Sequence, residues 1–278
     1  MILVKNKHIL TTALPVTSRE YKILLNSKKF HNIENGVEGF CSEFKKILDV
    51  LEGNFIEYEE TIKRKTWYLD TRKSELQKKS YVLRIRKEQG SNKKFKITLK
   101  FRDPDRYLSA SKDITASKKY KHKFEEDILP PFTPQYSHSV SINKKISPPL
   151  RNINDAIRMF PCIGELNLDE NSELISPKKF IAFETTCWIG AFDFENNDGS
   201  IKACLNFWHN SAKRNGIPLI AEFSFDYDSI EVNENEIEKF KLINISKSKE
   251  LFLRMQKMSA WIDASPSKTK TQLAYNII

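Results

Sequence analysis

Residues 81–102, YVLRIRKEQGSNKKFKITLKFR, alternate between apolar and polar side chains at both ends of the stretch. A period of two is the pattern of a β-strand with one buried face, and the polar, Gly-containing middle predicts a turn between two strands. The polar positions are almost all basic: Arg84, Arg86, Lys96, Thr98, Lys100 and Arg102. Two neighbouring strands are therefore predicted to share one apolar face and one cationic face.

The positive charge of the chain is concentrated around this hairpin. The 278 residues carry a formal net charge of +10, and residues 61–123 hold 21 of the 46 Lys and Arg but only 6 of the 36 Asp and Glu. Such a field attracts phosphate-rich partners: nucleotides, polyphosphate, nucleic acid or an anionic membrane. Lys-rich strands also occur as solvated faces or as edges protected against aggregation, and charge alone leaves that alternative open.

Composition limits the class of protein. A hydrophobic content of 40% and an aromatic content of 11% can form one large core or two small ones. The sequence has no run of 18 apolar residues and no signal-peptide h-region, so we expect a cytoplasmic protein without a membrane partner. The four cysteines form no CxxC pair, which argues against a zinc ribbon and favours reduced thiols, although disulfides are not excluded.

Several further segments show strand or helix periodicity. Strands are predicted over residues 16–25, 55–71, 119–128, 178–189, 200–208 and 219–228, and helices over 37–52, 154–160 and 248–263. The Pro-rich residues 129–150, LPPFTPQYSHSVSINKKISPPL, are predicted to be a boundary loop between two halves of the chain. The tail after residue 265 is predicted to be loose.

The polar faces of these strands carry charges of both signs. Examples are Glu20 and Lys22 in one strand, Lys123 and Glu125 in another, and Glu222 in a third. One such strand is merely solvated, but five or more, with apolar outer faces that helices can cover, indicate an α+β fold with an antiparallel barrel that is polar inside. The interior of such a barrel is a binding tunnel.

The ordered segments SREYKILL, TWYLDT, YVLRIR, ITLKF and KFEEDI resemble the CYTH superfamily, the triphosphate tunnel metalloenzymes. The family pattern runs ExExK, Y-[YL]-D-T, RxR, TxK, and then a basic residue followed by alternating acids. The resemblance covers residues 16–128, and LIAEFSFDYD (219–228) is similar to a late ExE strand. It implies a barrel of about eight antiparallel strands. It also implies one domain over residues 1–265, divided by the loop at 129–150, with a loose tail over 266–278.

The resemblance further implies that the lumen binds a triphosphate-containing small molecule, polyphosphate or an RNA 5′-triphosphate end, and that carboxylates hold Mg²⁺ or Mn²⁺. The implied phosphate ligands are Lys22, Arg84, Arg86, Lys96, Lys100 and Lys123. The implied metal ligands are Glu20, Glu222, Glu125 and Asp127. The implied catalytic residues are Glu20, Lys22, Arg84 and Arg86. Arg forks match phosphate oxygens, Lys supplies movable charges, and Mg²⁺ takes one or two carboxylates plus water and phosphate oxygens.

Two positions depart from the family pattern. Ser18 replaces the first acid of ExExK, and Ser224 replaces the second acid of the late ExE. Asp226, Glu184 or Glu125 can supply the missing charge from a neighbouring strand. Three hypotheses remain: a metal-dependent triphosphatase, a barrel that binds polyphosphate or nucleotides without turnover, and a protein that binds duplex nucleic acid through its outer basic surface. The sequence selects neither the organic group nor the oligomeric state.

Overall fold

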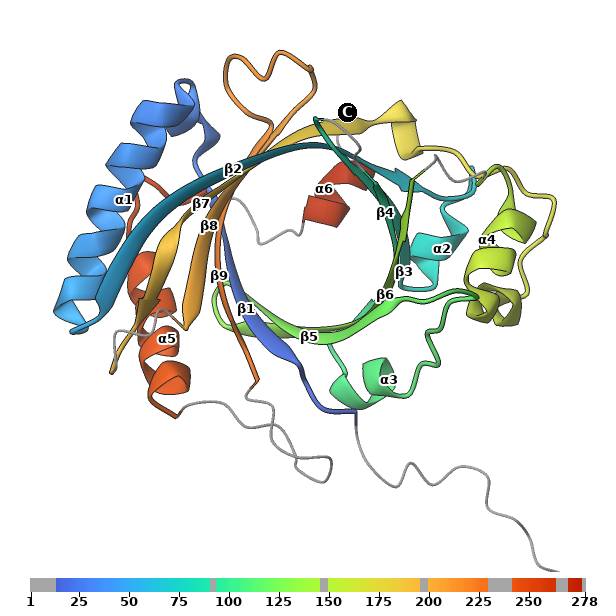
Figure 1. Cartoon of the computed structure of the whole chain (residues 1–278), viewed down its shortest axis with the longest axis horizontal. Helices are drawn as coiled ribbons and strands as arrows, with labels where there is room; N and C mark the ends of the chain where they lie inside the picture. Colours follow the sequence, from blue (N-terminus) through green and yellow to red (C-terminus); the bar gives the residue numbers. More distant parts are fainter. Residues whose placement is uncertain are drawn as a thin grey trace, which may run out of the picture.

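The computed structural model describes residues 14–90, 94–145, 150–195, 200–229, 242–263 and 270–276. Within these ranges nine strands form a closed barrel (Figure 1). The strands are β1 (Ser18–Leu25), β2 (Asn54–Leu69), β3 (Tyr81–Glu88), β4 (Phe95–Asp103), β5 (Lys121–Leu129), β6 (Thr133–Lys144), β7 (Ile181–Asp193), β8 (Ile201–His209) and β9 (Ile220–Asp228). In the same ranges, none of the helices has the length and apolar character needed to cross a membrane.

The predicted α+β barrel, with a polar interior and helices outside, is confirmed. Around the barrel the strands follow the order β1, β5, β6, β4, β3, β2, β7, β8 and β9, and β9 pairs with β1 to close it. Strands from both sides of residue 150 therefore belong to the same barrel. The structure differs from the expected barrel in two details, because it has a ninth strand and because β1 and β5 run parallel.

The additional strand is β6, which lies where the sequence predicted a boundary loop over residues 129–150 and therefore corrects that prediction. Pro134 lies near the beginning of β6, where a missing backbone N–H disturbs the ladder least. Farther along, SHSVSIN (137–143) alternates polar and apolar residues, and its pairing with both β4 and β5 completes the wall. The alternation of polar and apolar residues is thus a better predictor of structure here than the surrounding prolines, which indicate a loop.

The β3–β4 hairpin shows how the sequence pattern positions the lumen. Arg84 pairs with Thr98 across the two strands, and Arg86 pairs with Lys96. The alternate apolar residues, including Leu83 and Leu99, are fully buried on the outer side. Because successive side chains of a strand point to opposite faces, burying the apolar set turns the basic set into the lumen.

Helices supply the apolar cover of the barrel (Figure 1). On one side α1 (Ile33–Val50) buries Phe44 against Phe223 of β9, and α5 (Leu242–Met255) buries Phe252 against Tyr21 of β1. On another side α4 (Ile153–Met159) packs in the cluster that contains the outer faces of β3 and β4. Two short helices, α2 (Glu75–Lys78) and α3 (Arg106–Ala110), also lie outside the ring. Each fully buried large apolar side chain contributes about 1.5–3 kcal/mol.

The tail is a second correction, because residues 270–276 form helix α6 (Lys270–Asn276), where we expected loose chain over 266–278. Tyr275 is buried beside Tyr68 and Trp208, and its hydroxyl donates a hydrogen bond to Asp70 Oδ2 at 3.0 Å. In Figure 1, α6 lies within the outline of the barrel ring. Lys270 and Thr271 of this helix line the lumen, and Tyr275 ties it to Asp70 about 200 positions earlier in the chain.

Candidate functional site

A cavity of about 320 Å³ occupies the lumen, and side chains from all nine strands and from α6 line it. Each strand contributes alternate residues, as its pleat requires. Ligand pockets in proteins range from roughly 300 to 1,000 Å³. The cavity is therefore large enough for a small ligand or for the phosphate part of a larger one.

All six predicted phosphate ligands lie together around this cavity: Lys22, Arg84, Arg86, Lys96, Lys100 and Lys123. Three cations that we did not predict as ligands join them, namely Arg64, Arg102 and Lys270. Arg64 and Arg102 continue the period of two in β2 and β4, so the alternation contained the signal for both. Lys270 had no such signal, because its position depends on how α6 docks.

Arg84, Arg86 and Lys96 form a group of cations with few matching acids. Among the described residues, no ion pair joins Arg84 or Lys96 to a carboxylate, and Glu184 lies 3.7 Å from Arg86. Burial, reinforced by Arg86, lowers the pKa of Arg84 to about 10. Partial burial, reinforced by Arg86 and Arg84, lowers the pKa of Lys96 to about 8. The Nε atoms of Arg84 and Arg86 are buried without a hydrogen-bond partner, so the group is short of negative charge.

Two of the predicted metal ligands, Glu20 and Asp127, share one lysine. Lys22 Nζ lies 2.8 Å from Glu20 Oε2 and 2.8 Å from Asp127 Oδ1. Arg102 adds a second cation to Asp127 at 2.9 Å. Asp127 is 1% exposed, and burial would raise its pKa, but Lys22 and Arg102 together lower it. Asp127 therefore fixes the positions of two cations in the lumen.

Glu125 is paired in the same way. Its two oxygens accept hydrogen bonds from Lys100 and Lys123, each at 3.0 Å. Burial opposes ionisation of Glu125, but Lys100 and Lys123 outweigh that effect and hold its pKa well below the ordinary range. Like Asp127, Glu125 therefore has its negative charge balanced by cations of the same chain.

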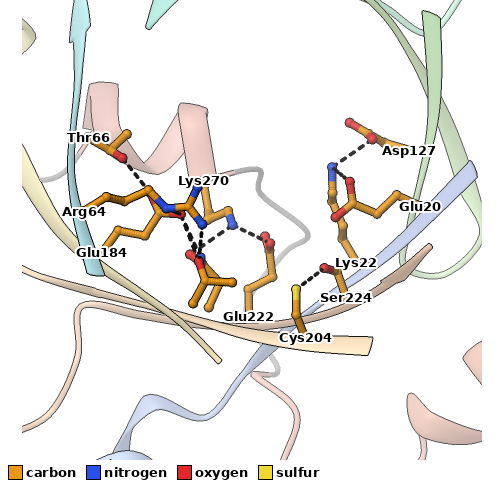
Figure 2. Close-up of polar contacts among 12 residues, drawn as sticks. Glu20, Lys22, Arg64, Thr66, Asp127, Glu184, Cys204, Glu222, Ser224 and Lys270 are labelled. Atoms are coloured by element: carbon orange, nitrogen blue, oxygen red, sulfur yellow. Dashed lines mark hydrogen bonds and ion pairs between the residues drawn. The ribbon is translucent and has the colours of Figure 1, made fainter. Parts of the chain in front are cut away.

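A buried network around Glu184 holds Arg64 (Figure 2) and also Arg86 in the lumen. Glu184 accepts hydrogen bonds from Thr66 Oγ1 at 2.5 Å and from Asn206 Nδ2 at 2.8 Å. Arg64 lies 3.4 Å from one of its oxygens, and Arg86 lies 3.7 Å from the other. Burial would raise the pKa of Glu184, but Arg86 and Arg64 keep it far below normal. With these four partners Glu184 is better suited to orient arginines than to bind a metal ion.

The fourth predicted metal ligand, Glu222, contacts α6. Lys270 Nζ lies 2.7 Å from Glu222 Oε1 and donates a hydrogen bond to Asn206 Oδ1 at 3.1 Å. Glu222 is only 4% exposed. Figure 2 shows this pair near the Glu184 network and apart from the Glu20, Lys22 and Asp127 group. Lys270 thus forms an ion pair with the carboxylate that the sequence pattern predicted as a metal ligand.

Glu20 has an acidic neighbour as well as Lys22. It pairs across the ladder with Asp226, and both residues line the cavity. Burial, then the charges of Glu20 and Asp228, raise the pKa of Asp226 to about 7. Within the part of the chain that the structure describes, no three His, Cys, Asp or Glu residues form a group that could hold a metal ion. Glu20 and Asp226 thus place two acids side by side in the lumen.

No protein-family model matches the chain, and no curated protein matches it. Among solved structures, a putative adenylyl cyclase from Hippeastrum, described as having a dominant triphosphatase activity, is 12% identical, with 94% of this chain and 96% of that chain covered and a TM-score of 0.47. A putative adenylate cyclase from Bacillus halodurans is 14% identical, with 94% and 98% covered and a TM-score of 0.38. Another from Vibrio parahaemolyticus is 9% identical, with 94% and 98% covered and a TM-score of 0.36.

Proposed function

We propose that the lumen binds the triphosphate group of a small molecule or a short polyphosphate. The observation that supports this function is the group of Arg84, Arg86 and Lys96, whose charges lie together in the barrel with few acids to balance them. Holding like charges in a desolvated site is costly unless a counter-charge enters. A triphosphate carries several negative charges on adjacent phosphoryl groups and satisfies several cations at once.

The pairing of the other lumen residues suits such a ligand. Glu184 keeps Arg64 and Arg86 in place, and Asp127 does the same for Lys22 and Arg102. Cations that are positioned before the ligand arrives need little rearrangement when charge develops on a transferred phosphoryl group. The proposed reaction is hydrolysis of a phosphoanhydride bond, with Arg84, Arg86 and Lys22 stabilising the phosphoryl oxygens.

Glu20 and Asp226 fit a divalent ion in this proposal. Two carboxylates, completed by water and phosphate oxygens, are the usual ligands of Mg²⁺, and the same set suits Mn²⁺. Such an ion, when bound, stabilises charge on phosphoryl oxygens and lowers the pKa of water. Asp226 then supplies the charge that Ser18 and Ser224 lack, and Lys22 holds Glu20 toward the lumen.

Phosphate release tests the proposal. The substrates are tripolyphosphate, ATP and thiamine triphosphate, each in Mg²⁺, Mn²⁺ or EDTA. We expect release that needs the metal and falls at least about 100-fold in Glu20→Gln and in Asp226→Asn. Glu38→Gln is the matched control, because Glu38 is an exposed acid on α1. Equal release in EDTA, or in both lumen variants, contradicts the proposed metal role.

A second candidate is a barrel that binds polyphosphate or a nucleotide without turnover. Glu222, Glu125 and Asp127 favour it, because each predicted metal ligand is already paired with Lys or Arg. This candidate predicts tripolyphosphate binding in EDTA and no phosphate release with any divalent ion. The two candidates share the ligand and differ only in chemistry.

A further inference from the structure

Two histidines meet on the outer wall of the barrel, away from the lumen. His122 of β5 pairs across the ladder with Val140, and His138 of β6 pairs with Phe124. The two rings are therefore diagonal neighbours on the outer face of adjacent strands. Their Nε2 atoms lie 2.6 Å apart, and the ring planes are perpendicular, with centroids 4.7 Å apart.

His138 is held in one orientation. Its side chain is 5% exposed, and its Nδ1 lies 3.3 Å from the backbone carbonyl oxygen of Ser109 in α3. A carbonyl oxygen only accepts, so Nδ1 carries the proton and Nε2 keeps a lone pair. That lone pair points at the Nε2 of His122. A histidine whose second nitrogen donates to a backbone carbonyl is the usual arrangement of a metal ligand.

We propose that His122 and His138 form a binding site for Cu²⁺ or Ni²⁺ that is separate from the lumen. A metal ion about 2.0 Å from His138 Nε2 takes the place that His122 Nε2 holds 2.6 Å away, so the exposed ring of His122 swings outward to reach the same ion. Imidazole suits Cu²⁺, Ni²⁺ and Zn²⁺, but nitrogen ligands hold Cu²⁺ most tightly of these ions.

The exposed side of the pair is open to the remaining ligands. His122 is exposed, so solvent reaches its ring directly. In the free protein its Nε2 donates to His138, and transfer of that proton to Nδ1 frees a second lone pair without a net change in charge. No third protein ligand of the usual types joins the pair among the described residues, so water completes the coordination shell.

Titration of the full chain with Cu²⁺, followed by electron paramagnetic resonance, tests the site. We expect one Cu²⁺ with two nitrogen ligands in the native chain. His122→Ala should weaken binding at least 10-fold, and circular dichroism checks that the variant folds, because the substitution also removes the hydrogen bond to the buried His138. His31→Ala is the matched control, since His31 is exposed and follows Phe30, whose ring packs on Phe207 of β8. Cu²⁺ should also compete with Ni²⁺ and bind more tightly than Zn²⁺.

Two results overturn the proposal. The first is a Cu²⁺ spectrum and affinity that persist in His122→Ala. The second is a single nitrogen ligand in the native chain. His138→Gln, checked for folding by circular dichroism, must lose the same Cu²⁺ as His122→Ala. Binding of tripolyphosphate should be equal in His122→Ala and in the native chain, which separates this site from the lumen.

Discussion

Replacement of Arg84 by methionine is expected to make the ligand-free protein more stable. The pKa of Arg84 is lowered to about 10, mainly by burial and then by Arg86. A tenfold change in acidity corresponds to about 1.4 kcal/mol, so the charge costs the folded state up to about 3 kcal/mol. The side chain is partly exposed to the lumen, where water screens its charge. We therefore expect a gain of about 1–2 kcal/mol in the free energy of unfolding.

The same substitution is expected to weaken ligand binding. Arg84 offers a guanidinium group in the middle of the cation group, and charge-assisted hydrogen bonds contribute about 1.5–3 kcal/mol each. Tripolyphosphate should bind about 10- to 150-fold more weakly to Arg84→Met. A residue that was merely structural would change stability and binding in the same direction, whereas a ligand residue held at a cost changes them in opposite directions.

Urea unfolding at pH 7 measures both effects, first without phosphate and then with millimolar tripolyphosphate in EDTA. The midpoint of Arg84→Met should be higher than that of the native chain without ligand, and its ligand-induced increase should be smaller. Arg158→Met is the control, because Arg158 is exposed on α4 and should change neither value. A lower midpoint without ligand, or an undiminished response to tripolyphosphate, refutes the reasoning.

Three further perturbations test other parts of the lumen. Lys270→Met leaves the buried carboxylate of Glu222 unpaired and should lower the free energy of unfolding by about 1–3 kcal/mol. Adding Glu222→Gln to the same chain should largely restore the stability. An equal loss in the single and the double variant argues against the ion pair. Tyr275→Phe removes a hydrogen bond to Asp70 and should cost about 1–2 kcal/mol by urea unfolding, whereas no change indicates that α6 is not docked there. Calorimetry should show that the affinity for tripolyphosphate falls as pH rises above about 8, because Lys96 loses its proton in the free protein. Lys96→Met should flatten this pH dependence. A native chain whose affinity does not change with pH contradicts the role of Lys96.

The barrel was largely predictable because alternation is a local property of the sequence. At both ends of residues 81–102 every second residue is apolar, and burial of that set left one orientation for the basic set. The same period was present in SHSVSIN (137–143), but the surrounding prolines favoured a loop. The parallel pairing of β1 with β5 had no local signal, since the register of Ser18 opposite Glu125 depends on closure of the whole barrel.

The pairing of charges inside the lumen was less predictable than their presence. Alternation indicated that Lys22 and Asp127 both face inward, but strands about 100 residues apart must be adjacent before the two can form an ion pair. Docking of α6 likewise brings Lys270 to Glu222. Sequence reasoning therefore identified most of the charged lumen residues and left open which acids balance cations of the chain and which are available to a metal ion.

A crystal structure of the protein with tripolyphosphate, prepared in EDTA, tests the central claim most directly. The account predicts that the phosphate chain lies inside the barrel, within hydrogen-bond distance of Arg84, Arg86 and Lys96. Phosphate density confined to the outer basic surface, or a lumen left without phosphate at saturating ligand, would contradict it.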